Sequence, residues 1–309
     1  MLVMIVMFIA TLSVSGNLVP IYALFETLQL IVHMPLVSIN LPGSVTQFIM
    51  PIADLIQFNM FGANDAIKER WGISKDDLAY NQVFYQAGYK NSAILPNLGL
   101  IILLLIIAAA YLIVAFIKDL YVIRHDTMNP FWRKRIVPYA TNFMARLISL
   151  CFLEILICCI INSQSLNFDD SRLKVSSYVT IGFGITCLAF LLFTLSLTCC
   201  HDLFIDKTSE EVSPYYSTLF HGLNKKHPLR SAIYPSWFLL RRVIYAWLLI
   251  YAPDYPVGQI FILAIMSLIM LFIIWGLKPY ESGENRCLQL INETVVFLMT
   301  VFMLAFTTY

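Results

Sequence analysis

The amino-acid sequence predicts an all-α protein, a polytopic transmembrane helical bundle with about seven spans. The chain of 309 residues is 59% hydrophobic and 13% charged, and its mean hydropathy is +0.76. A soluble globular domain is usually nearer half apolar and a quarter charged. The sequence also contains a series of apolar runs of about 20 residues, the length that crosses a bilayer as a helix. We therefore interpret residues 1–309 as a single transmembrane domain.

The later spans are predicted by mostly apolar runs at about 97–117, 140–162, 175–200, 235–252, 257–276 and 288–307, and the third and fifth spans of the chain also contain charged residues. The first span lies within residues 1–36, where Gly16 and Pro20 interrupt the run. A signal peptide would carry basic residues before its apolar core, and this run has none. We interpret it as one kinked span, with two short membrane segments as the alternative.

The distribution of Lys and Arg predicts which loops are cytosolic. The loops after the second, fourth and sixth spans hold eleven of these residues, and the opposite side holds six. Because basic loops stay in the cytosol, we expect residues 38–96 to form an external segment and residues 201–234 a cytosolic insert. Within 38–96, the capping-box-like start at Ser74 to Asp77 predicts a short helix. The tyrosines of that helix suit a membrane interface.

Seven ionisable side chains within the predicted spans form a candidate polar cluster. Such residues are costly in a bilayer unless they are paired or hydrated, so each is a candidate for function. They comprise three acids, three arginines and one histidine: Glu26, Glu154, Glu293, Arg146, Arg241, Arg242 and His33. The equal number of acids and arginines suggests internal pairing, and an arginine of the third or fifth span is the expected partner of Glu293.

Polar residues recur at helical spacing within several spans. Glu26, Gln29 and His33 share one helix face, because their spacing is i, i+3 and i+7. Lipid cannot satisfy such a stripe, so it should point into the bundle. Two readings follow: hydrogen bonds that fix the order of the helices, or a polar pathway for an ion, a proton or a headgroup. For Arg241 and Arg242, extension to the cytosolic headgroups is the alternative to pairing with an acid.

The sequence contains no recognisable enzyme motif. It has no His-Glu-x-x-His, no nucleophile elbow and no glycine-rich phosphate loop. The residues from Cys199 to Asp202 include metal-ligand types but lack a second half for zinc. We therefore expect no enzymatic activity, no cofactor and no metal. The net charge of +1 gives no indication of nucleic-acid binding.

The expected partners are membrane lipids and other membrane subunits, including a second copy of the chain. Lys225, Lys226 and Arg230 form a basic group in the cytosolic insert. Anionic headgroups gain about 1 kcal/mol per basic residue near the surface, so we expect these residues to contact lipid headgroups. We expect the protein in the plasma membrane.

Two stretches resemble a known family. "ETLQLIVHMPLVSINLPGSVTQF", which begins at Glu26, is similar to the segment that opens the C-terminal multi-pass membrane module of ciliate cysteine-rich surface proteins. "LKPYESGENRCLQLINE" resembles the turn before the last helix of that module. It also distantly resembles the matching turn of fungal transient-receptor-potential-like (flavin-carrier-type) membrane proteins. The matching residues are Lys278, Pro279, Tyr280, Asn285, Leu288, Asn292 and Glu293.

The resemblance implies a membrane-embedded helical bundle that is channel-like or lipid-handling. The given residues depart from the ciliate family because they contain no cysteine-rich ectodomain, so a surface-receptor or adhesion role is expected only if the chain is a fragment of a longer protein. The alternative is a structural or anchoring subunit of a larger membrane complex, with no transport activity.

Overall fold

The described part of the chain has the all-α fold that the sequence predicts. The computed structural model describes residues 19–37, 80–89, 91–125, 130–199, 222–224 and 228–307, together with 205–206, 211–212, 219 and scattered residues between 39 and 53. Six helices there are long and apolar enough to cross a membrane. The first predicted span is represented by a shorter apolar helix, since residues 1–18 lie outside the described part. The chain is thus a multi-pass integral membrane protein.

The helices follow the order of the predicted spans. They are α2 (Val19–His33), α5 (Gln82–Gln86), α6 (Ile94–His125), α7 (Pro130–Ser163), α8 (Ser171–Cys199), α10 (Pro228–Tyr251), α11 (Pro256–Phe272) and α12 (Gly283–Met303). Short turns extend three of them: the 3-10 helix η1 (Met34–Leu36) after α2, the π-helix η4 (Ile273–Leu277) after α11, and the 3-10 helix η5 (Leu304–Phe306) after α12. One small hairpin, β1 (Ile205–Asp206) with β2 (Glu211–Val212), lies in the predicted cytosolic insert.

The helices are longer than the predicted spans, because a helix continues past the apolar stretch that hydropathy detects. α6 begins at Ile94, so the loop part of the external segment ends before residue 96. α10 begins at Pro228, so the loop part of the cytosolic insert ends before residue 234. Proline suits the first position of a helix, because its φ angle is already helical and no amide is left unpaired there.

A short helix occurs in the external segment, and an asparagine caps it. Asn81 Oδ1 accepts a hydrogen bond from Val83 N at 2.6 Å, at the start of α5. Asparagine is among the favoured N-cap residues, because its side chain satisfies an amide that the helix leaves unpaired. The predicted capping box at Ser74 to Asp77 lies outside the described residues.

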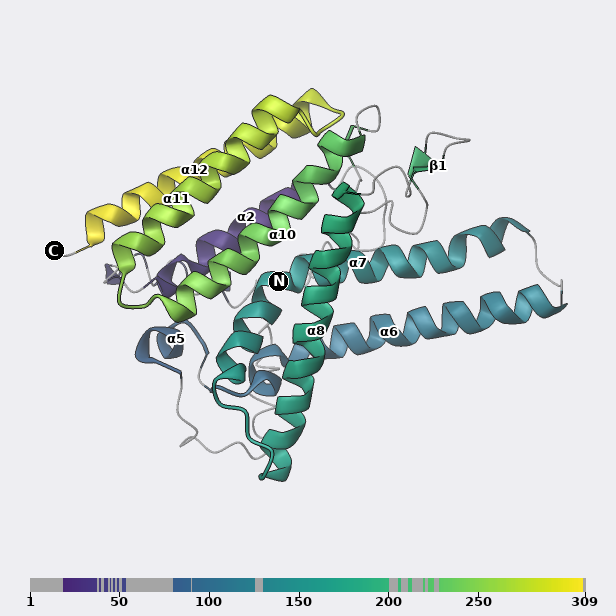
Figure 1. The fold of residues 1–309 in the computed structure, drawn as a ribbon, viewed down its shortest axis with the longest axis horizontal. Helices are drawn as coiled ribbons and strands as arrows, with labels where there is room; N and C mark the ends of the chain where they lie inside the picture. The colour runs from purple at the N-terminus through teal and green to yellow at the C-terminus, as the bar shows by residue number, and fades with distance from the viewer. Residues whose placement is uncertain are drawn as a thin grey trace.

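α7 is the central helix of the bundle. It packs against α6, α8 and α10, and 67% of its apolar span is buried, against 22% for α6. In Figure 1, α6 and α7 form an antiparallel pair that extends away from the group of α2, α10, α11 and α12, while α8 crosses the pair. The exposed apolar faces of α6 and α8 are surfaces that lipid would cover in a membrane.

A buried asparagine joins α7 to α8. Asn162 Nδ2 donates to Ser176 Oγ at 3.0 Å and to Thr180 Oγ1 at 2.5 Å. All three residues are buried. Hydrogen bonds between helices in a membrane contribute roughly 0.6–2 kcal/mol each, so this contact stabilises the pairing of two helices whose outer faces are largely apolar.

Candidate functional site: two buried polar clusters

A buried ion pair joins α10 to α12. Arg241 Nη1 donates to Glu293 Oε2 at 2.5 Å, and Nη2 donates to Oε1 at 2.9 Å. The planar guanidinium matches a carboxylate with two parallel hydrogen bonds, which makes this a strong form of ion pair. The two residues are 3% and 2% exposed, so Arg241 does not extend to the headgroups. Glu293 therefore has its arginine partner on the fifth predicted span.

Further polar residues surround this pair. Gln289, one turn before Glu293 on α12, donates from Nε2 to Tyr234 Oη at 2.9 Å. Tyr280 packs edge-on against Tyr234, with ring centroids 5.2 Å apart. We call Glu26, Tyr234, Arg241, Gln289 and Glu293 the arginine cluster.

Tyr280 lies in the turn between α11 and α12, close enough to the acids of this cluster for their charges to affect its pKa. Burial raises the pKa of Tyr280 well above its ordinary value of 10.0, and the neighbouring Tyr234 raises it further. The carboxylates of Glu26 and Glu293 also raise the pKa of Tyr280. An anionic phenolate would lie in a dry site near two acids, so the neutral phenol is strongly favoured. Glu26 is buried on α2, which packs against α12.

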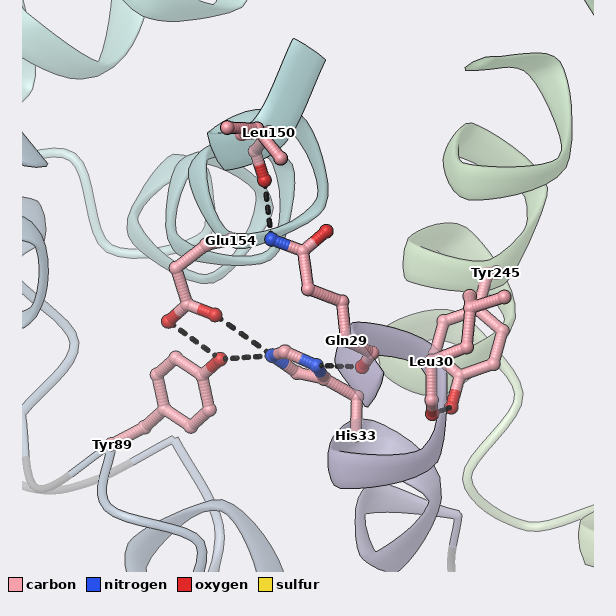
Figure 2. A network of polar contacts seen from close by, with 7 residues as sticks. All are labelled: Gln29, Leu30, His33, Tyr89, Leu150, Glu154 and Tyr245. Carbon is pink, nitrogen blue, oxygen red and sulfur yellow. Dashed lines mark hydrogen bonds and ion pairs between the residues drawn. The ribbon is translucent and has the colours of Figure 1, made fainter. Parts of the chain in front are cut away.

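A second cluster joins α2, α7 and the external segment (Figure 2). His33 Nε2 lies 2.8 Å from Glu154 Oε2, and Tyr89 Oη donates to Glu154 Oε1 at 2.8 Å. The third side of the triangle, from His33 Nε2 to Tyr89 Oη, is 3.0 Å. All three residues are at most 2% exposed. We call His33, Tyr89 and Glu154 the histidine cluster.

Side chains that bond to helix backbones surround the histidine cluster. In Figure 2, Gln29 Nε2 donates to the carbonyl oxygen of Leu150 on α7, and Tyr245 Oη of α10 donates to that of Leu30 on α2 at 3.1 Å. Arg242 Nη1 donates to the carbonyl oxygen of Ser149 at 2.8 Å, and its guanidinium lies 4.0 Å from the ring centroid of Phe238. α2, α7 and α10 are thus joined by polar contacts at the level of the histidine cluster.

The structure places the predicted site residues in different settings. Glu26, His33, Glu154, Arg241, Arg242 and Glu293 are all buried, and Arg146 is half-buried on α7. The partner of Glu154 at 2.8 Å is His33, although only arginines were expected to answer the acids. The imidazole reaches Glu154 because α2 lies within contact distance of α7. Lys225 and Lys226 lie outside the described residues, and the side chain of Arg230, in the first turn of α10, is also outside them.

Tyr89 and Tyr234 belong to the clusters but were not predicted from the sequence. Tyr89 lies in the external segment. The tyrosines of that segment are expected at the membrane interface, but Tyr89 is only 2% exposed. A local feature accompanies it: Gly88 adopts a positive φ of 102°, which glycine tolerates best and which ends α5 just before Tyr89. Tyr234 occupies an apolar-looking stretch of α10. Only a three-dimensional arrangement shows that these hydroxyls meet acids and amides.

Backbone hydrogen bonds join the turn before α12 to the end of the cytosolic insert. Asn224 N donates to the carbonyl oxygen of Pro279 at 2.6 Å, and Glu281 N donates to that of Gly222 at 3.0 Å. Lys278, just after the π-helix η4, has a φ of 50°, a conformation that costs a non-glycine residue roughly 1–2 kcal/mol. The two backbone hydrogen bonds therefore hold this turn in place at the start of α12.

The raised pKa of Tyr280 predicts sensitivity to alkaline conditions. A group whose pKa is higher in the folded state contributes stability that is present below its ordinary pKa and is lost as the pH rises above it. The unaltered protein should therefore lose stability above pH 10.0, and Tyr280→Phe, which has no phenol to ionise, should lose less there. Thermal unfolding in detergent as a function of pH measures both effects. The exposed Tyr255→Phe is the control, and parallel pH profiles for all three proteins would contradict the prediction.

The chemistry of these clusters is that of charge pairing and proton exchange. Among the described residues, no three His, Cys, Asp or Glu side chains come together in a way that could hold a metal ion. The ionisable groups of the two clusters are one guanidinium, one imidazole, three carboxyls and two phenols, which can form ion pairs and can hold or share protons. Each cluster draws its members from at least three separate segments of the chain.

The fold and the clusters together define a multi-pass membrane protein with a polar, acid–base interior. No family model matches the chain, and neither a curated protein nor a solved structure matches it significantly.

Proposed function

We propose that the protein is a channel-like membrane transport protein whose polar interior is formed by the arginine and histidine clusters. One observation carries the proposal: acids and bases from four helices are buried inside the bundle, in two clusters. They come from α2, α7, α10 and α12, and they are Glu26, His33, Glu154, Arg241 and Glu293. The resemblance of the two terminal stretches to the ciliate module implies the same class.

The free-energy cost of these residues supports a functional role. Ionisable side chains in spans are rare, and they commonly mark the route of an ion or proton. Where helices only need to be joined, apolar side chains of similar volume often serve equally well or better. α2 also connects the two clusters, because Glu26 and His33 lie on one face of it, about 10 Å apart along its axis. Glu26, Gln29 and His33 follow this face of α2 and are all buried, and such a row of polar groups supports a pathway through the bundle.

The proposal predicts that transport depends on the charges and not merely on the contacts of the arginine cluster. We expect the purified protein in liposomes to conduct protons or small ions, measured as dye-reported flux and as current across planar bilayers. The double variant Arg241→Gln with Glu293→Gln keeps two amides that can hydrogen-bond to each other but removes both charges. We expect this variant to fold and its flux to be at least about tenfold lower. That decrease corresponds to a transport barrier that is higher by roughly 1.4 kcal/mol.

The control replaces an exposed acid on the same helix, Glu284→Gln, and should leave the flux unchanged. If the unaltered protein is no more permeable than empty liposomes for protons, sodium, potassium and chloride, the transport proposal is wrong. If the double variant conducts as well as the unaltered protein, the arginine cluster is not part of the pathway.

A scaffold or anchoring subunit is the second candidate. The contacts that favour it are side chain-to-backbone hydrogen bonds, in which Gln29, Arg242 and Tyr245 each bind a carbonyl oxygen of a neighbouring helix. Such contacts fix the positions of α2, α7 and α10 without moving charge. Under this reading the membrane is no more permeable with the protein than without it, and the same variants change only its stability or its assembly with other subunits.

A further inference from the structure

The protons of the histidine cluster can be assigned from its geometry. His33 Nδ1 lies 2.6 Å from the carbonyl oxygen of Gln29, one turn earlier on α2 (Figure 2). A carbonyl oxygen can only accept a hydrogen bond, so Nδ1 must carry a hydrogen. The tautomer of the imidazole is thereby fixed, and only Nε2 is left to gain or lose a proton. Nε2 is the nitrogen that faces Glu154 and Tyr89.

The 2.8 Å contact between His33 Nε2 and Glu154 Oε2 requires one shared proton. If Glu154 is ionised, Nε2 must carry the proton and donate it to the carboxylate. If the imidazole is neutral, Oε2 must carry the proton and donate it to Nε2. Tyr89 donates to the other oxygen, Oε1, in both arrangements. Every polar atom of the triangle is therefore satisfied when one proton lies between Nε2 and Oε2.

Loss of that proton would leave two lone pairs facing each other at hydrogen-bond distance. The pair would also carry a net negative charge in a site where all three residues are at most 2% exposed. A buried polar group without a hydrogen-bond partner is costly. Deprotonation therefore opposes the contact that holds α2 against α7.

We propose that the histidine cluster is a proton-binding site that fixes α2 against α7 when the proton is bound and releases that contact when the proton is lost. Tyr89 contacts both other members of the site. The inference is independent of the transport proposal, because a scaffold could carry the same proton-controlled contact.

The other titratable groups around the cluster belong to α7, α10 and the external segment. Among the described residues these groups are Cys151 and Cys158 of α7, Arg242 and Tyr245 of α10, and Tyr80. Arg242 is the one permanent charge among them, and it donates to the carbonyl oxygen of Ser149, ahead of Glu154 on α7. None of these groups takes part in the triangle of contacts among His33, Tyr89 and Glu154.

The variant Glu154→Gln tests the proposal, because glutamine mimics the protonated carboxyl. Its amide N–H can donate to His33 Nε2 and its amide oxygen can accept from Tyr89, so the fold should be retained. The measurement is the pH-difference infrared spectrum of the full chain in lipid nanodiscs. The unaltered protein should show a buried carboxyl and imidazole band that titrates. We expect Glu154→Gln to lose this band entirely, whereas Asp254→Asn, which removes an exposed acid, should keep it.

Tyr89→Phe provides a graded readout. The phenol donates one hydrogen bond to Glu154 Oε1, so its removal should shift the frequency of the carboxyl band without abolishing the band. A spectrum of Glu154→Gln that equals that of the unaltered protein would overturn the proposal. So would a Tyr89→Phe spectrum in which the carboxyl band is unchanged.

A measurement on the unaltered chain covers the case in which Glu154→Gln fails to fold. Nitrogen-15 NMR of labelled histidine distinguishes the protonation of the two ring nitrogens. We expect one of the five histidines to keep a hydrogen on Nδ1 throughout the titration while Nε2 alone responds, and His33→Gln should remove that signal. If no histidine keeps its Nδ1 hydrogen, the proton assignment, and the proposal with it, is wrong.

Discussion

Glu293→Leu is expected to destabilise the bundle by about 3–5 kcal/mol, because it leaves the buried guanidinium of Arg241 without its carboxylate. The arginine is 3% exposed and donates two hydrogen bonds to Glu293, at 2.5 and 2.9 Å. In Glu293→Leu those two donors lose their acceptors at a buried position. The measurement is the free energy of unfolding in detergent micelles, from the denaturant dependence of the helical signal.

The double variant Arg241→Met with Glu293→Leu tests whether the loss of stability in Glu293→Leu comes from the unpaired guanidinium. Apolar residues of similar volume often replace a buried ion pair at little cost, so the double variant should recover most of the stability that Glu293→Leu loses. A coupling free energy of at least about 2 kcal/mol is expected in the double-mutant cycle. Losses that simply add would show that the two side chains do not interact. Glu284→Leu, at an exposed position of α12, is the control and should change stability by less than about 0.5 kcal/mol.

Phe152→Ala is expected to cost a similar amount, about 3–5 kcal/mol, through the cavity it creates. Phe152 is fully buried on the central helix α7, and its ring centroid lies 6.3 Å from that of Phe190 on α8. Lipid tails cannot enter the space left behind, so the surrounding side chains lose their packing contacts outright. Unfolding in the same detergent measures the loss.

The matched control is Phe302→Ala on α12. Phe302 is 65% exposed, so lipid or detergent fills the space that its ring leaves. We expect a loss of less than about 1 kcal/mol there, because one apolar environment replaces another. Equal losses at Phe152 and Phe302 would mean that α7 is not the interior helix of the bundle.

Hydropathy predicted the helices of the bundle but not their ends. Apolar runs locate α6 to α12 because a bilayer demands about 20 apolar residues per span. The ends of α10 are set instead by Pro228 and by the turn at residues 252–255, where apolar character gives no indication. The two-residue strands at 205–206 and 211–212 carry no periodic pattern, so they could not be predicted either.

Helical spacing indicated which polar residues face inward, but not which of them meet. The stripe formed by Glu26, Gln29 and His33 follows from a period of 3.6 residues, and all three side chains are buried. Glu154, however, contacts a histidine that lies 121 residues away in the sequence. Sequence spacing carries no information about contacts at such separations. Tyr89 was missed for the same reason, since its partner Glu154 is on a different segment.

The buried ion pair also bears on how the chain enters the membrane. The span in α10 has a mean hydropathy of 1.2, the lowest of the six candidate spans, and it contains both Arg241 and Arg242. An arginine at the centre of a helix opposes insertion by the translocon by about 2.5 kcal/mol, so α10 is poorly suited to insert alone. Its counter-charge, Glu293, is synthesised only two helices later. Stable integration of α10 therefore waits for α11 and α12, and these three helices should enter the bilayer as one cooperative unit during translation.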